Sequence, residues 1–140
     1  MKFSEKVSNQ RRKQRQLHFS APSHIKYTLM SAPLSEELQK EHGIQSLPIR
    51  RDDVVEILRG SNKGTSGKIN VVYRKKWCLY IEKIQKQSKK GGVIKIPIQS
   101  SNVRITKLYL TEDRKALINR KRIGRGIEKG KYTQQEVNAN

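Results

Sequence analysis

Hydrophobic side chains recur at alternate positions in several short runs through the middle of the chain, and glycine, lysine and other polar residues separate these runs. In "DDVVEIL" the alternation places Val55 and Ile57 on one face. In "WCLYIEKI" it places Trp77, Leu79 and Ile81 on one face. A period of two is the pattern of a half-buried strand. The runs "KINVVY", "VIKIPI" and "NVRI" are also rich in β-branched residues, so four or five short strands are predicted.

These strands fit a small SH3-like barrel over residues 49–110, because closing a short sheet into a barrel removes its exposed edges. Pro97 marks the end or the edge position of one strand. Residues 1–48 are expected to form a basic N-terminal arm with a short helix, and residues 111–140 a helix followed by a polar tail. The predicted fold class is therefore mostly β, with helical segments on either side of the barrel.

The two predicted helices carry recognisable ends. Over residues 35–42, "SEELQKEH", Ser35 is an N-cap candidate and Gly43 a stop. Over residues 111–122, Thr111 is an N-cap candidate, acidic residues fill the first turn and basic residues the last, and Gly124 is expected to end the helix. Residues 1–30 show no sustained apolar period, which favours an extended arm with a helical turn that orders on its partner.

The stretch "RGSNKGTSGKI" from Arg59 to Ile69 resembles a phosphate-binding loop at first sight. A P-loop needs Gly, four residues, then Gly-Lys and Ser or Thr. Here position 62 is Asn62 and position 69 is Ile69, and strands rather than a long helix follow. A basic turn between two strands is the better interpretation, with glycines where φ is positive.

Charge sets the class of partner. The chain of 140 residues has 31 Lys and Arg against 12 Asp and Glu, a net charge of +19 and a pI near 10.4. Residues 49–110 alone hold fifteen basic and four acidic side chains, so the excess lies in the predicted fold as well as in the ends. Such a surplus indicates a polyanionic partner. Membrane insertion is not expected, because no apolar run approaches the roughly 18 residues of a spanning helix.

RNA is favoured over DNA as that partner. No helix-turn-helix, zinc finger or basic zipper is recognisable, and irregular RNA is recognised by shape, phosphates and splayed bases. A solvated basic surface without a ligand is the alternative, but three basic turns in one small domain disfavour it. Those turns contain Arg59, Lys63 and Lys68; Arg74, Lys75 and Lys76; and Lys86, Lys89 and Lys90. Stacking candidates are Phe19, Tyr27, Tyr73 and Trp77, although Trp77 is expected in the core.

Catalysis finds little support in the residues. His18, His24 and His42 lie outside the predicted strands and have no second ligand at metal spacing. Adjacent positions on a strand would point Asp52 and Asp53 to opposite faces, which disfavours a shared carboxylate site. Local pairing with Arg50, Arg51 or the turn is expected instead. The single cysteine, Cys78, is expected to be a buried thiol. No enzyme activity, metal or cofactor is predicted.

Longer stretches carry a family resemblance. The segment "DDVVEILRGSNKGTSGKINVVYRKKWCLYIE" resembles the KOW motif, in which a strand leads into a Gly-containing turn and Gly-Lys-(Val/Ile) opens the next strand. The flanks "RRKQRQLHFSAPSHI", "LMSAPLSEELQKEHGIQSLPIRRDD" and "VRITKLYLTEDRKALINRKR" resemble the arm and the extension of the KOW-containing large-subunit ribosomal protein family, numbered twenty-four in the universal naming and twenty-six in the eukaryotic one.

This resemblance implies an SH3-like barrel and a structural role in the large subunit, near the peptide exit tunnel and in subunit assembly. It implies large-subunit rRNA, neighbouring ribosomal proteins and exit-site factors as partners, and a cytoplasmic location after a nuclear or nucleolar stage. The alternative is a KOW interaction module of a transcription or regulatory complex. The candidate RNA contacts are Arg11, Arg12, Lys13, Arg15, His18, Ser23, His24, Lys26, Arg50, Arg51, Arg59, Gly60, Lys63, Gly64, Gly67, Lys68, Arg74, Lys75, Lys76, Arg120, Lys121 and Arg122.

Overall fold

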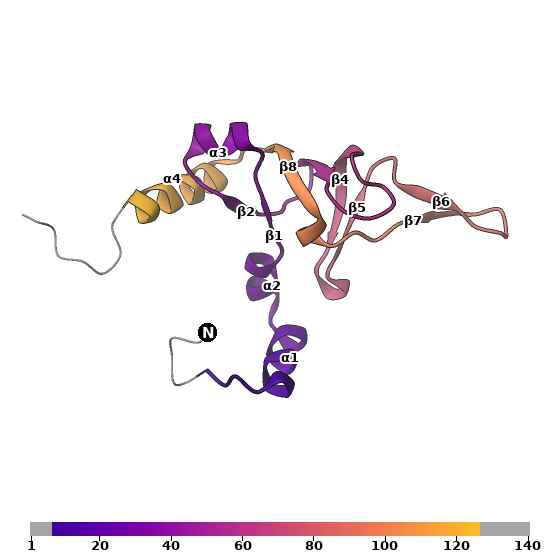
Figure 1. Cartoon of the computed structure of the whole chain (residues 1–140), viewed down its shortest axis with the longest axis horizontal. Coiled ribbons are helices and arrows are strands. Elements are labelled where there is room, and N and C mark those ends of the chain that lie inside the picture. The colour runs from indigo at the N-terminus through magenta and orange to yellow at the C-terminus, as the bar shows by residue number, and fades with distance from the viewer. Residues whose placement is uncertain (1–6, 127–140) are drawn as a thin grey trace, which may run out of the picture.

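The computed structural model describes residues 7–126, which form eight strands, four α-helices and two short 3-10 turns (Figure 1). The order along the chain is α1 (Arg11–Ser20), α2 (Ser23–Leu29), β1 (Ser31–Pro33), α3 (Glu36–His42), β2 (Ser46–Pro48), β3 (Val54–Ile57), β4 (Ser66–Tyr73), η1 (Arg74–Lys76), β5 (Cys78–Ile81), β6 (Gln85–Gln87), β7 (Val93–Lys95), η2 (Ser100–Asn102), β8 (Val103–Lys107) and α4 (Glu112–Gly126).

A four-stranded antiparallel sheet in the order β5-β4-β3-β8 forms the centre of the molecule. The pairing of β4 with β5 shifts register between Ile69 and Val71, so a bulge lies in the long strand. Beyond the sheet edge, Leu79 of β5 pairs with Ile98, and the chain then returns through η2 into β8. Two smaller antiparallel pairs, β1-β2 and β6-β7, complete the strands.

The core is built from the alternate positions that the sequence pattern indicated. Val55 and Ile57 of β3 are buried, as predicted, and they belong to one core with Leu79 and Ile81 of β5. The N-terminal region contributes to the same core through fully buried residues such as Leu47 of β2. The segment from β1 to β2 is therefore part of the packed fold.

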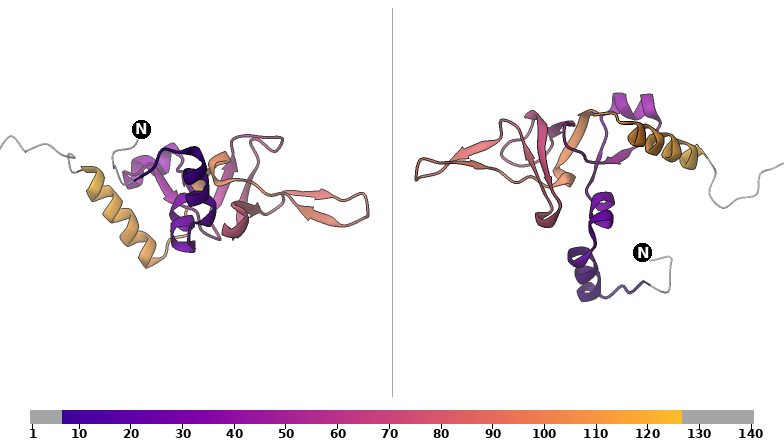
Figure 2. Two further views of the ribbon diagram at one scale, coloured as in Figure 1. Left: turned by 90° about the horizontal axis from the view of Figure 1, so that it is seen from below. Right: turned by 180° about the vertical axis from the view of Figure 1, so that it is seen from behind.

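The helices and the β6-β7 hairpin extend from this core in three directions. In Figure 1, α1 and α2 lie below β1, α3 and α4 lie together at one end, and the β6-β7 hairpin projects from the other end. The views in Figure 2 show the same arrangement from below and from behind. Because the helices contain more residues than the strands, the expectation of a mostly β fold is corrected to a mixed fold of antiparallel sheets and helices.

Several element predictions are confirmed and others are wrong. Ser35 caps α3 by accepting a hydrogen bond from the Leu38 backbone N–H at 3.5 Å, and Gly43 ends that helix at φ +68°. The predicted third basic turn, with Lys86, Lys89 and Lys90, belongs to the hairpin of β6 and β7. The extended arm is wrong, because two helices occupy residues 11–29. Gly124 does not end α4, which continues to Gly126; the predicted polar tail beyond it lies outside the described residues.

Candidate nucleic-acid interface

The turn between β3 and β4 presents basic side chains on a backbone that satisfies its own hydrogen bonds. Gly60 and Gly64 have φ of +98° and +82°, so glycine is favoured there as predicted. The Gly64 N–H donates to the Ile57 carbonyl at 2.8 Å, and the Lys63 N–H donates to the Gly60 carbonyl at 3.2 Å. Arg59 and Lys63 are exposed at this turn and are available to an anionic partner.

Gly67 serves packing. A Cβ at this position would lie 2.7 Å from Cγ2 of Ile81 and 2.8 Å from the carbonyl oxygen of Glu82. These distances are shorter than van der Waals contact, and Gly67 does not have a positive φ. The prediction that this glycine supplies a left-handed turn is therefore wrong; the close approach of β5 to β4 is what requires glycine.

Lys68 has an internal counter-ion. Its ammonium nitrogen lies 2.8 Å from a carboxylate oxygen of Asp52, which sits in a turn at φ +73° and not on a strand as predicted. The hydrogen bond between the two side chains lowers the pKa of Asp52 and raises the pKa of Lys68. The Arg51 guanidinium lies 3.9 Å from the same carboxylate and is largely exposed. Of these two neighbouring cations, Arg51 is the freer to meet a phosphate.

An aromatic stack joins the N-terminal helices to the second basic turn. The ring of His18 on α1 stacks on Trp77 at 3.9 Å between centroids with an interplanar angle of 14°. The Lys26 ammonium lies 5.6 Å from the Trp77 ring, and the Arg74 guanidinium lies 5.3 Å from the Tyr27 ring. We call His18, Lys26, Tyr27, Arg74 and Trp77 the arm–turn cluster. These cation–ring contacts bring together two predicted groups of cations that lie far apart in the sequence.

Trp77 takes part in this cluster because of its backbone. It follows η1 with φ +57°, a left-handed conformation that ends the turn, instead of lying inside β5 as predicted. The side chain is half-buried, packing against the core while His18 covers its ring. Trp77 therefore couples the core to the arm.

Further cation–ring pairs extend the basic surface around the cluster. The Arg15 guanidinium lies 4.9 Å from the Phe19 ring, and the Lys76 ammonium lies 5.3 Å from the Tyr73 ring. The exposed rings and guanidinium groups offer both phosphate binding and base stacking. The remaining predicted contacts of this region are exposed: Arg11, Arg12 and Lys13 on α1, Ser23 and His24 at the start of α2, and Lys75 in η1.

The predicted contacts on α4 are partly used inside the molecule. The Lys121 ammonium donates to the Ser46 carbonyl at 3.1 Å, and Arg122 donates to the Asn119 side chain at 3.5 Å. Arg50 donates to the Thr111 hydroxyl at 3.0 Å. Arg120 is exposed, and no hydrogen bond of its side chain is found within residues 7–126. Lys121 and Arg50 thus hold α4 against the fold, while their exposed parts remain cationic.

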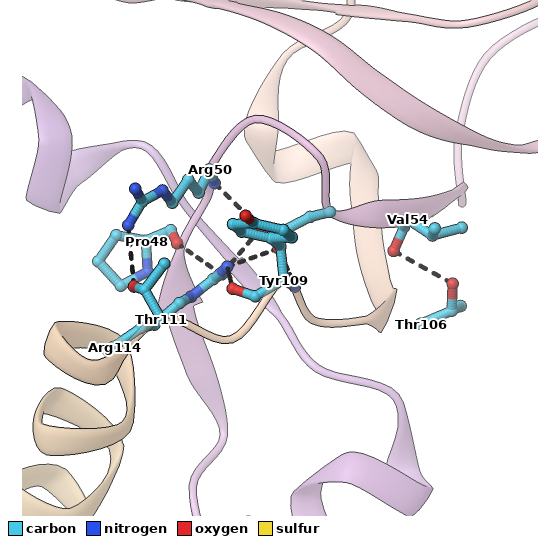
Figure 3. A network of polar contacts seen from close by, with 8 residues as sticks. Pro48, Arg50, Val54, Thr106, Tyr109, Thr111 and Arg114 are labelled. Atoms are coloured by element: carbon cyan, nitrogen blue, oxygen red, sulfur yellow. Dashed lines mark hydrogen bonds and ion pairs between the residues drawn. The ribbon is translucent and has the colours of Figure 1, made fainter.

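The central polar feature is one that sequence reasoning missed. Asp53 is fully buried, and its carboxylate receives two hydrogen bonds from the buried guanidinium of Arg114 on α4, at 2.5 and 2.8 Å. Figure 3 shows Arg114 beside Pro48 and Tyr109 in the same network. The backbone N–H groups of Arg50 and Tyr109 also donate to it, at 3.0 and 2.9 Å. Arg114 in turn donates to the carbonyls of Pro48 and Tyr109.

This network fixes the C-terminal helix to the sheet. Asp53 precedes β3, and Arg114 lies in the first turn of α4. A bidentate pair of this kind is directional and costly to break when both groups are buried. The predicted local pairing of Asp53 is correct only for the Arg50 backbone; the main partner lies 61 residues away.

The third basic turn stands apart from the other two. Lys86, Lys89 and Lys90 lie on the β6-β7 hairpin, which projects away from the sheet (Figure 2). Val93 and Ile94 on the same hairpin are exposed. The hairpin therefore forms a separate basic surface and is not continuous with the arm–turn cluster.

Other kinds of site are scarce in the part of the chain that the structure describes. Within residues 7–126 no cluster of three or more His, Cys, Asp or Glu could hold a metal ion. No helix in this region is long and apolar enough to cross a membrane. Cys78 is a buried free thiol, as predicted.

Comparison with known proteins finds one protein family, and its members match most of the chain. The model of the family that comprises ribosomal protein L26 of eukaryotes and its archaeal counterpart matches residues 8–121. The chain is 54% identical over 121 residues to the large ribosomal subunit protein uL24 of Schizosaccharomyces pombe, covering 86% of this chain and 96% of the relative. It is 46% identical over 142 residues to the protein of the same name from Caenorhabditis elegans, covering 99% and 100%. The Candida albicans protein of that name is 48% identical over 120 residues, covering 86% and 94%.

Proposed function

The chain belongs to the ribosomal protein family of eukaryotic L26 and its archaeal counterpart, and from this membership we infer that it is a structural constituent of the large ribosomal subunit that binds rRNA. The observation that carries this conclusion is the match itself, which extends over nearly the whole length of relatives named as large-subunit proteins. The net charge of +19 supplies the physical reason, because so large a positive surplus favours binding to a polyanion such as RNA.

The rRNA contacts are proposed at the exposed cations. Arg59 and Lys63 would bind phosphates at the glycine turn, and the arm–turn cluster with its neighbouring arginines would bind a second segment of RNA. Each neutralised phosphate releases counterions, so affinity should fall steeply with salt. Lys68, Lys121 and Arg122 have internal partners and would contribute less than their charge suggests.

An SH3-like barrel is proposed for residues 49–110, within the division into arm (1–48), barrel and extension (111–140). Support comes from the sheet order β5-β4-β3-β8, in which β5 and β8 are the edges. Ile98 pairs with β5 through two backbone hydrogen bonds with Leu79, at 2.7 and 3.0 Å, and lies a few residues before β8. Together with the bulge in β4, this return path would close the sheet on itself.

The finer role follows the family resemblance. We place the protein near the peptide exit tunnel of cytoplasmic ribosomes, after an assembly stage in the nucleolus, with exit-site factors as further partners. It would act without catalysis, through binding alone. A KOW module of a regulatory complex is not favoured, because similarity to a large-subunit protein extends over the full length of the Caenorhabditis elegans relative.

Sedimentation tests this function. Lysate is run on a sucrose gradient at high salt, and the protein is followed by antibody. Co-migration with large subunits and whole ribosomes is expected, and RNase treatment should abolish it. A protein found in light fractions, or released from subunits by moderate salt, would contradict the proposal and favour the regulatory module.

A further inference from the structure

An apolar groove lies between α1 and α2, and of the arm–turn cluster only His18 reaches it. It encloses about 350 Å³ and is lined by Gln14, Leu17, His18, Ser20, Ala21, Pro22, Ile25 and Leu29. Leu17 and Leu29 are 59% and 50% exposed, and Ile25 is 43% exposed. Large apolar side chains that remain this accessible around one hollow indicate a ligand surface.

The surrounding charge restricts the chemistry of that ligand. Residues 7–30 contain Lys and Arg but no Asp or Glu, and the first acidic residue after this segment is Glu36. Arg11, Arg12, Lys13 and Arg15 are all exposed on α1. A ligand that suits this site is anionic on the outside and apolar in the part that enters. A nucleotide has this combination, with a phosphate and a flat base.

Size favours a base over a protein segment. A stable protein interface buries about 800 Å² on each partner, whereas the lining residues of this groove span about two turns of α1 and little more than one turn of α2. A single base extruded from the RNA can be bound between apolar side chains in such a hollow. Its edge can also be read, because the His18 ring lines the groove, and no hydrogen bond to its nitrogens is found among the residues described.

We propose that the groove between α1 and α2 receives one unpaired nucleobase of the rRNA, while the α1 arginines bind the phosphates on either side of it. This proposal rests on the proposed rRNA-binding function and names the part of the RNA that the arm recognises. The stack of His18 on Trp77 fixes the orientation of the groove relative to the fold before RNA binds. Little ordering of α1 and α2 is then required on binding.

Affinity and its salt dependence separate a base contact from a phosphate contact. The probe is deproteinised large-subunit rRNA, bound at several salt concentrations by the wild type, by the double variant Leu17→Ser/Ile25→Ser, and by Arg11→Ala/Arg12→Ala. The groove variant should bind about 5- to 150-fold more weakly at fixed salt, with an unchanged slope of log K against log salt. The arginine variant should flatten that slope by about 1.4 to 1.8.

Matched controls make each outcome decisive. Ile123→Ser removes a comparably accessible isoleucine from α4 and should leave affinity unchanged. Circular dichroism checks that the exposed substitutions leave the fold intact. An unchanged affinity of the groove variant, or a loss with a flatter slope, would overturn the base-binding proposal alone. A wild type that does not bind rRNA would overturn the proposed function itself.

Photocrosslinking identifies the occupant directly. Benzoylphenylalanine is introduced at Ile25, and at Ile123 as the control, in large subunits purified from cells that express each variant. Mass spectrometry after irradiation and digestion should find a nucleotide adduct at Ile25 that maps to one unpaired position. A peptide adduct would assign the groove to a neighbouring protein and overturn the proposal, as would the absence of any adduct.

Discussion

Replacing Arg114 by leucine should destabilise the fold strongly, because it leaves the buried carboxylate of Asp53 without its counter-ion. The guanidinium donates twice to this carboxylate, at 2.5 and 2.8 Å, and once each to the carbonyls of Tyr109 and Pro48, at 3.1 and 3.2 Å. Breaking a buried pair by removing one partner costs about 3–5 kcal/mol. We expect the upper part of this range, since the two carbonyls lose donors as well.

That loss is a large fraction of the free energy of unfolding of a small domain, which is about 5–15 kcal/mol. Urea denaturation of the wild type, Arg114→Leu, Asp53→Asn and the double variant measures it. The double variant should cost less than the sum of the two single variants, because the groups act as one unit. Hydrogen exchange should also rise along α4, since Arg114 anchors the first turn of that helix to the sheet.

Lys115→Leu is the matched control, a cation-to-apolar change at the next position of α4 where the side chain is exposed. It should change the free energy of unfolding by less than about 0.5 kcal/mol. The reasoning is refuted if Arg114→Leu costs less than about 1 kcal/mol, well below the cost of breaking a buried pair, or if its cost and that of Asp53→Asn simply add.

Three further predictions follow from the turns. Gly67→Ala should lower the urea midpoint clearly, because the new methyl group would lie 2.7 Å from a side chain of β5. In Gly92→Ala the new methyl group has no neighbour within 4 Å, so this control should leave the midpoint nearly unchanged. Equal midpoints for the two variants would contradict this reasoning. Lys63→Ala should flatten the slope of log K against log salt for rRNA binding by about 0.7 to 0.9. Lys68→Ala should flatten it by less, because Asp52 already neutralises the Lys68 ammonium. An unchanged slope for Lys63→Ala would exclude a phosphate contact of Lys63. The pKa of Asp52 is lowered in the folded state, so its carboxylate contributes stability above its ordinary pKa of 3.8, and this contribution is lost as pH falls through the lowered value. The free energies of unfolding of the wild type and Asp52→Asn should therefore differ at neutral pH and converge in acid. A difference that persists at the acid limit would contradict the ion pair.

Local signals were sufficient wherever a few neighbouring residues decide the structure. Ser35 and Gly43 mark the two ends of α3 because capping involves only the adjacent backbone. Gly60 and Gly64 are recognisable for the same reason, since a positive φ is a property of the single residue. The alternation of Val55 and Ile57 predicts the buried face of β3 because the strand period sets it.

The two arm helices were missed because their usual signals are absent. The residue before α1 is Gln10 and that before α2 is Pro22, and neither makes a side-chain capping bond. No apolar stripe of α1 reaches the core, since none of its residues is buried. The usable signal was composition: "RRKQRQL" consists of good helix formers, and their summed propensity favours a helix without any core contact.

The Asp53–Arg114 network could not be found from local pattern at all. Asp52 and Asp53 are neighbours of one residue type, yet one forms a solvent-accessible pair with Lys68 and the other is fully buried. What separates them is the positive φ of Asp52, which turns the chain, and the docking of a helix 61 residues away. Long-range packing of this kind has no period and no cap in the sequence.

The internal contacts also change which cations can meet RNA. Arg114 and Lys68 are paired with carboxylates, so they offer less free charge than the composition suggests. Lys121 keeps its charge, but its ammonium is held at the Ser46 carbonyl. Exposed cations gather at the two ends of β4, in the glycine turn before it and in η1 after it. An eight-residue strand separates these ends by about 25 Å. Phosphates at that separation lie well beyond the Debye length of about 8 Å at physiological salt, so the two ends bind as independent electrostatic sites and their effects on affinity should add. Such a surface suits folded rRNA that presents separate strands to one small protein.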